Sequence, residues 1–192
     1  MSEKFFDVYI DFGSSKIIAT AFNKKNKKSF SVSSKCFSSF KSTQLNFKDS
    51  KIVLEKLILE IEKKTGEYLN SINLMIDSPE VLSIGVSLSK KNDGKKIRKS
   101  DIQYLIQEAK QEVIKFHPNK NIIHIIASNY KVDNNNFDYP PIDVECNFFV
   151  IDIIFICYPK ELIKNLESLF YENQININQV LSSSYAKSLN CK

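Results

Sequence analysis

Residues Tyr9–Thr20, YIDFGSSKIIAT, decide the fold expected for this chain, because two apolar runs meet there at a short turn of small, polar residues. The runs Val8–Asp11 and Lys16–Phe22 are rich in β-branched and aromatic residues, a composition that predicts strands. The Gly-Ser-Ser segment between them is short enough to close a hairpin. We therefore predict that the chain begins with two antiparallel strands.

The turn of this hairpin also has the residue types of a phosphate-binding loop. An anion would be bound by the backbone N–H groups around Gly13, the hydroxyls of Ser14 and Ser15 and the charge of Lys16. The carboxylate of Asp11 is suited to binding a hydrated Mg²⁺. The same residues also suit an ordinary hairpin turn with a surface lysine. The turn alone does not decide between the two interpretations, so the surrounding sequence must.

Length and composition indicate a globular protein with a substantial core. The chain has 192 residues, of which 43% are hydrophobic and 26% charged, values typical of globular domains and not of disordered chains. No apolar run approaches the roughly 20 residues of a membrane-spanning helix, and the N-terminus lacks the pattern of a signal peptide. These features predict a cytoplasmic location.

The net charge of +5 comes mainly from lysines, with runs at Lys24–Lys28 and Lys90–Lys96 that we assign to loops between strands. A nucleic-acid-binding surface would combine such charge with exposed aromatic residues, whereas most aromatics here fall at positions suited to a core. Nucleic-acid binding is therefore not expected. The many Lys, Asn, Ile and Phe residues also suit a composition set by an AT-rich genome.

The cysteines and histidines do not form a pattern for metal binding, disulfides or nucleophilic catalysis. The four cysteines are widely separated with no CxxC pair, and neither histidine has a spacing typical of a zinc ligand or a catalytic partner. We expect free, mostly buried thiols. The residues are Cys36, Cys146, Cys157, Cys191, His117 and His124.

Hydrophobic periodicity predicts β-β-β-α-β for residues 1–80, with a third strand at Ser29–Ser38, a helix at Ser50–Tyr68 and a strand at Ser71–Asp77. Residues 81–157 then add a strand, a helix and two more strands. The helix is marked by a capping box of Ser100 and Gln103 and by an apolar stripe that ends at Phe116. The three strands are Val81–Ser89, Asn121–Val132 and Asn147–Cys157, the last two separated by a polar connection at Asp133–Glu145.

The final residues predict α-β-α. Tyr158-Pro159 opens a helix with a buried stripe from Leu162 to Phe170, Ile175–Leu181 forms a strand, and Ser182–Leu189 a short helix capped by Ser182 or Ser183. The predicted domains are therefore residues 1–80 with 158–192, and an inserted subdomain at residues 81–157. The fold class is α/β, an actin-like (ribonuclease H-like) lobe with a strand-helix-strand-strand insert.

This arrangement resembles FtsA, the actin-related family of bacterial cell-division proteins. The resemblance rests on Tyr9–Ile17, which is similar to the first phosphate motif of the family, on Ile122–Asp133 and on Val180–Leu189. One departure is Asp138–Asp143, which replaces a glycine-rich turn of the family. A second is that the 192 residues end where the second lobe of the family would begin, so its second phosphate loop, adenosine pocket, FtsZ-binding subdomain and membrane-targeting helix are expected to be missing.

The resemblance implies a cell-division scaffold that links FtsZ to the membrane, recruits later division proteins and self-associates through the inserted subdomain. It places the protein at the inner face of the cell membrane at the division site, with membrane contact only indirect. ATP and Mg²⁺ are the cofactors of the family, with Asp11, Gly13, Ser14, Ser15 and Lys16 as the matching residues. Because half a cleft cannot position phosphates, metal and water together, we expect weak nucleotide binding at most and no enzymatic activity.

Three other interpretations compete with this one. The first is a PilM-like actin relative of a pilus or secretion machine, which has a similar insert and binds a partner peptide. The second is a phosphotransferase of the sugar-kinase or heat-shock-chaperone type, which would need a second glycine-rich loop; the four glycines, at Gly13, Gly66, Gly85 and Gly94, do not supply one. The third is a degenerate lobe kept only for protein interaction.

Overall fold

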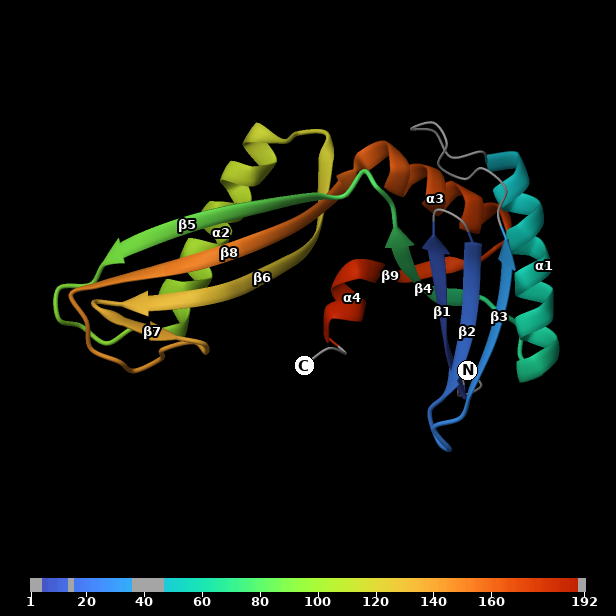
Figure 1. Cartoon of the computed structure of the whole chain (residues 1–192), viewed down its shortest axis with the longest axis horizontal. Coiled ribbons are helices and arrows are strands. Elements are labelled where there is room, and N and C mark those ends of the chain that lie inside the picture. Colours follow the sequence, from blue (N-terminus) through green and yellow to red (C-terminus); the bar gives the residue numbers. More distant parts are fainter. Residues whose placement is uncertain (1–4, 14–15, 36–46, 190–192) are drawn as a thin grey trace. The chain divides into compact units, whose positions relative to one another are not determined.

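A computed structural model describes residues 5–13, 16–35 and 47–189. The chain divides into two compact units, one formed by Met1–Glu80 with Glu161–Lys192 and the other by Val81–Lys160. Figure 1 shows that each unit has its own sheet, with several helices in the first unit and a single helix in the second. The second unit is thus an insertion into the chain of the first.

The first unit is built on a five-stranded mixed sheet with the strand order β3-β2-β1-β4-β9. The first three strands form the predicted antiparallel meander, whereas β4 pairs parallel with β1, and β9 pairs parallel with β4. This mixture follows from the connections, since tight turns join the antiparallel strands and longer crossovers join the parallel ones. The strands are β1 Phe6–Gly13, β2 Lys16–Asn23, β3 Ser29–Lys35, β4 Ser71–Asp77 and β9 Asn176–Ser182.

The core of this unit lies on one face of the sheet. Alternate residues of β1, β2 and β4 are fully buried, and their register aligns them across the strands: Ile10 lies opposite Ala19 and Leu74. Helix α1 (Phe47–Thr65) packs against β2 and β3. The ion pair Lys51–Glu172, 2.7 Å, joins α1 to α3 (Lys160–Glu172). Helix α4 (Ser183–Leu189) lies against β4 and β9.

Helix α1 starts and ends three residues earlier than the sequence predicted. Its buried stripe of Leu54, Leu57, Ile58 and Ile61 is as predicted. The helix stops at Thr65 because Gly66 adopts a left-handed conformation with φ of 70° and donates its N–H to the Glu62 carbonyl at 2.8 Å. A left-handed glycine is a common helix C-terminus, and it was not recognised in the sequence.

The second unit is a four-stranded antiparallel sheet, ordered β5-β8-β6-β7, with helix α2 against it. Its strand β8 is central, and Phe149, Ile151, Ile153, Phe155 and Cys157 of this strand face the core. Residues Ile102, Leu105, Ala109 and Val113 of α2 complete that core. The elements are β5 Leu82–Lys91, α2 Lys99–Phe116, β6 Lys120–Val132, β7 Asn135–Phe137 and β8 Phe148–Pro159.

The insert therefore has one strand more than predicted. The predicted polar connection contains β7, which pairs with the end of β6 through Tyr130 opposite Phe137 and Val132 opposite Asn135. Asp133, with φ of 49°, turns the chain between these strands. The left-handed conformation suits Asp and Asn in hairpin turns, which is why a run of asparagines forms a hairpin at this position.

Three further local predictions were wrong. Helix α2 is not capped by Ser100 and Gln103: it begins after Arg98, whose backbone N–H donates to Asp101 at 2.9 Å. Phe116 is 69% exposed and not part of the apolar stripe, because the helix ends there. Tyr158-Pro159 belongs to β8 and does not open α3, since this end of the strand pairs with β6 at Lys120–Asn121.

Candidate functional site

The candidate site of the first unit lies where three parallel strands end. Strand β1 ends at Gly13, β4 at Asp77 and β9 at Ser182. Because these strands run in the same direction, their carboxyl ends meet at one edge of the sheet. This edge is where open α/β sheets usually bind ligands. The phosphate-type turn of the sequence follows directly from the first of these strand ends.

Asp11 is held at this edge by a residue 172 positions away in the chain. The Ser183 hydroxyl donates to the Asp11 Oδ1 atom at 2.6 Å, and Ser183, the first residue of α4, is completely buried. Asp11 itself is half-buried. The hydrogen bond orients the carboxylate and ties the first strand of the unit to its last helix.

Position 13 requires a glycine, because strands β1 and β2 approach each other closely there. A Cβ atom at this position would lie 2.9 Å from the Lys16 carbonyl oxygen, closer than real side-chain carbons approach a backbone atom. The glycine therefore lets the hairpin close tightly after β1. A backbone without a side chain at such a turn is also what an approaching phosphate requires. The structure thus gives Gly13 a steric role that exists with or without a ligand.

Of the other predicted site residues, the structure describes only Lys16. Lys16 begins β2 and its side chain is exposed. Ser14 and Ser15 lie outside the described residues. The structure thus brings Asp11, Gly13 and Lys16 to one hairpin, and among them only Asp11 has a described side-chain hydrogen bond to another element. The assignment of these residues to a phosphate and hydrated-metal site stays a prediction.

Three residues of this edge were not assigned to the site from the sequence. Ser183 was predicted only as a possible helix cap, and the ion pair between Lys187 of α4 and Asp77 at the end of β4, 3.4 Å, was not predicted. The available signal was positional: Asp77 and the serines after Leu181 each follow an apolar strand. Which strand ends become neighbours depends on sheet order, and periodicity does not supply that.

The two cysteines that the structure describes match the expectation of free, buried thiols. Cys146 and Cys157 are free and buried, and burial raises the pKa of both thiols, which disfavours the reactive thiolate. Cys36 and Cys191 lie outside the described residues. Burial lowers the pKa of His124, so its ring is neutral at pH 7.

Within residues 5–13, 16–35 and 47–189, no three His, Cys, Asp or Glu side chains are grouped as a metal site. None of the helices described there is both long enough and apolar enough to cross a membrane.

The fold and the strand-end site define the class of this chain. The fold is an actin-like ATPase lobe with an antiparallel insert. Its features are the sheet order β3-β2-β1-β4-β9, the phosphate-type hairpin after β1 and the second unit inserted between β4 and α3. The insert can be named more closely, because residues 80–156 match the model of the SHS2 domain inserted in FtsA. The chain therefore contains an FtsA-type SHS2 domain within an actin-like lobe, in agreement with the resemblance stated from the sequence.

Solved structures show the same fold at low sequence identity. A chain of the PilM-PilN type IV pilus biogenesis complex superposes with a TM-score of 0.58 at 8% identity, over 94% of this chain and 48% of that one. This chain thus spans about half the length of that relative. No curated protein sequence matches significantly.

Two further structures are similar at lower scores. The cytoplasmic domain of EpsL, an inner membrane component of the Vibrio cholerae type II secretion system, has a TM-score of 0.41 at 9% identity, covering 92% of this chain and 55% of that one. A Bacteroides thetaiotaomicron protein with an actin-like ATPase fold and unknown function has a TM-score of 0.42 at 16% identity, covering 94% and 53%.

Proposed function

We propose that this chain is the N-terminal lobe of an FtsA-type cell-division scaffold, which connects FtsZ to the membrane and recruits later division proteins. The observation that supports this most directly is the FtsA-type SHS2 domain at residues 80–156, inserted after β4 of an actin-like lobe. A separately folded unit placed between two elements of a lobe can present a contact surface without disturbing the lobe's own core. We assign protein contacts, including self-association, to this insert.

The proposed scaffold acts at the inner face of the cell membrane at the division site. Its test combines capture and localisation. We expect the tagged chain to retain purified later division proteins of the same organism, and a fluorescent fusion of the chain to gather at midcell only while FtsZ rings are present. A fusion that stays diffuse, together with failure to retain any division protein, would contradict the proposal.

A second candidate is a PilM-like component of a pilus or secretion machine. The specific observation in its favour is the PilM superposition, with a TM-score of 0.58 over 94% of this chain. The two candidates separate in one pull-down with two baits: the cytoplasmic tail of a PilN-like protein and the cytoplasmic tail of a later division protein. Retention of the pilus tail alone favours the pilus candidate, and retention of the division-protein tail alone favours the division scaffold.

We further propose that these 192 residues bind ATP weakly at most and do not hydrolyse it. Phosphoryl transfer needs phosphates, metal and water positioned from several directions, whereas Asp11, Gly13 and Lys16 belong to one hairpin. A titration with a fluorescent ATP analogue and Mg²⁺ is expected to show no saturation. Saturable binding that an Asp11→Asn variant abolishes would overturn this part of the proposal and leave the scaffold function standing.

A further inference from the structure

One loop of the insert concentrates positive charge. Between Lys90 and Lys99, six of ten residues are cationic (Lys90, Lys91, Lys95, Lys96, Arg98 and Lys99) and only Asp93 is acidic. The loop joins β5 to α2. The sequence indicated no more than a solvated loop tip, and the structure gives two reasons to assign it a role in binding. The inference rests on the proposed function, in which this insert makes protein contacts.

The first reason is that the backbone of the loop is fixed. Its N–H groups at Asn92, Gly94 and Ile97 donate to the carbonyls of Asn147, Cys146 and Val144 at 2.8, 2.9 and 2.9 Å. Ile97 is completely buried in the core of the insert. The loop is thus clamped along the segment that precedes β8, and its cationic side chains project from a defined backbone.

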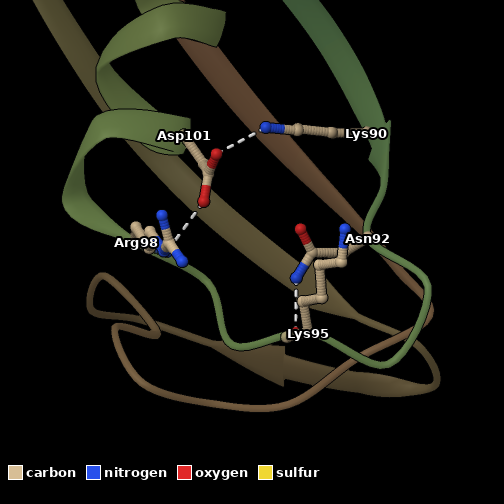
Figure 2. Close-up of polar contacts among 5 residues, drawn as sticks. All are labelled: Lys90, Asn92, Lys95, Arg98 and Asp101. Carbon is tan, nitrogen blue, oxygen red and sulfur yellow. Dashed lines mark hydrogen bonds and ion pairs between the residues drawn. The ribbon is translucent and has the colours of Figure 1, made fainter.

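Side-chain contacts brace the same loop (Figure 2). The Lys90 ammonium pairs with the Asp101 carboxylate, which also accepts the backbone N–H of Arg98. The amide of Asn92, which is 7% exposed, donates to the Lys95 carbonyl. Lys90 lowers the pKa of Asp101 through this hydrogen bond, followed by the Arg98 N–H, so the carboxylate stays ionised. Both carboxylate oxygens of Asp101 therefore already accept hydrogen bonds from groups of the insert itself.

The second reason is that four of the six cations remain available, and three of these line one pocket. Lys95, Lys96 and Arg98 are exposed, and no carboxylate in the described part of the chain forms an ion pair with them. They line a pocket of about 620 Å³, together with Ser100, Asp101 and Glu145. Five cations and three acids line the whole pocket, so its net charge is 5 − 3 = +2.

We propose that this pocket is a docking site for an acidic segment of a partner protein. Its lining contains no apolar or aromatic side chain among the described residues, which disfavours a lipid surface or a stacked single strand of nucleic acid. Separate carboxylates on a peptide match spaced Lys and Arg side chains, and they find room in a pocket of this size.

The test measures binding of a short, fluorescein-labelled, Glu-rich peptide to the full chain by anisotropy. The probe variant is Lys95→Gln with Lys96→Gln and Arg98→Gln. The control variant has the same change in net charge at exposed lysines of the other unit, Lys28→Gln with Lys56→Gln and Lys63→Gln. Circular dichroism melts of both variants confirm that they are folded. The same titrations with single-stranded DNA and with anionic phosphatidylglycerol vesicles complete the set.

We expect the probe variant to weaken peptide binding about tenfold and the control variant by less than about twofold. Equal weakening by both variants, no binding of the peptide, or tighter binding of DNA or vesicles than of the peptide would overturn the proposal. The result is separable from the proposed function. Capture of later division proteins without peptide binding rejects only the pocket, and peptide binding without capture of division proteins rejects only the division role.

Discussion

The Lys90–Asp101 ion pair is expected to stabilise the insert measurably. Asp101 lies in the first turn of α2 and Lys90 near the end of β5, so the pair links two elements of the unit. The side chains are only 18% and 33% exposed, respectively. Replacing Asp101 by Asn removes the charge but leaves an oxygen that still accepts the Arg98 N–H. The substitution thus tests the charge separately from the cap.

The magnitude follows from burial and geometry. A partly buried ion pair stabilises the fold more than a fully solvated one, so we assign this pair about 1 kcal/mol of the free energy of unfolding. Loss of the negative charge near the N-terminus of α2 removes a further contribution of about 0.5 kcal/mol. Asp101→Asn should therefore lower the free energy of unfolding by about 1.5 kcal/mol. In a double-mutant cycle with Lys90→Met, the coupling energy should be about 1 kcal/mol.

The matched control is the Lys91–Asp93 pair of the same loop. Its side chains are 78% and 63% exposed at 2.9 Å, so its coupling should be below about 0.3 kcal/mol. Urea unfolding followed by far-UV circular dichroism measures both cycles on the full chain. Hydrogen exchange of residues 99–116 places the effect in α2. Equal coupling energies in the two cycles would refute the assignment of stability to burial of the first pair.

The same pair predicts a direction for the pH dependence. The pKa of Asp101 in the folded chain lies below its ordinary value of 3.8, so its contribution is complete above that pH and is lost as the pH falls through the folded pKa. The stability difference between the parent chain and Asp101→Asn should thus be constant near neutrality and shrink in acid. A difference that grows on acidification would contradict the cause assigned to the shift.

Three further outcomes test the packing described above. Gly13→Ala should lower the free energy of unfolding by about 1–3 kcal/mol, because the new Cβ atom meets the Lys16 carbonyl oxygen. The control Gly85→Ala, where a Cβ atom meets open space, should change the free energy of unfolding by less than about 1 kcal/mol. Ser183→Ala should cost about 1–2 kcal/mol in urea unfolding, and less in an Asp11→Asn background, because the two side chains share one hydrogen bond. Phe155→Ala should cost about 3–5 kcal/mol and melt the insert at a lower temperature, because this side chain is fully buried in the core of the insert; a loss below about 1 kcal/mol would contradict that placement.

The local elements were largely predictable because their signals are local. Alternation along β5 and β8, the apolar stripes of α1 and α3 and the small residues of the first turn specify strands, helices and a hairpin from neighbouring residues alone. Apart from the missed strand β7, the errors occurred at element ends, where a competing contact decides at which residue an element stops. Gly66 stops α1 early, and pairing with Lys120–Asn121 keeps Tyr158-Pro159 in a strand.

The sequence by itself determined the order of the elements apart from β7, the inserted unit and the residue types at the phosphate-type turn. Tertiary structure alone decided which strand ends share an edge, so that Ser183 meets Asp11 across 172 positions, and which lysines of the Lys90–Lys99 loop are paired. The physical reason is that hydrophobic periodicity records which face of an element is buried, whereas hydrogen-bond and ion-pair partners depend on sheet order and register. Those depend on contacts between residues far apart in the chain.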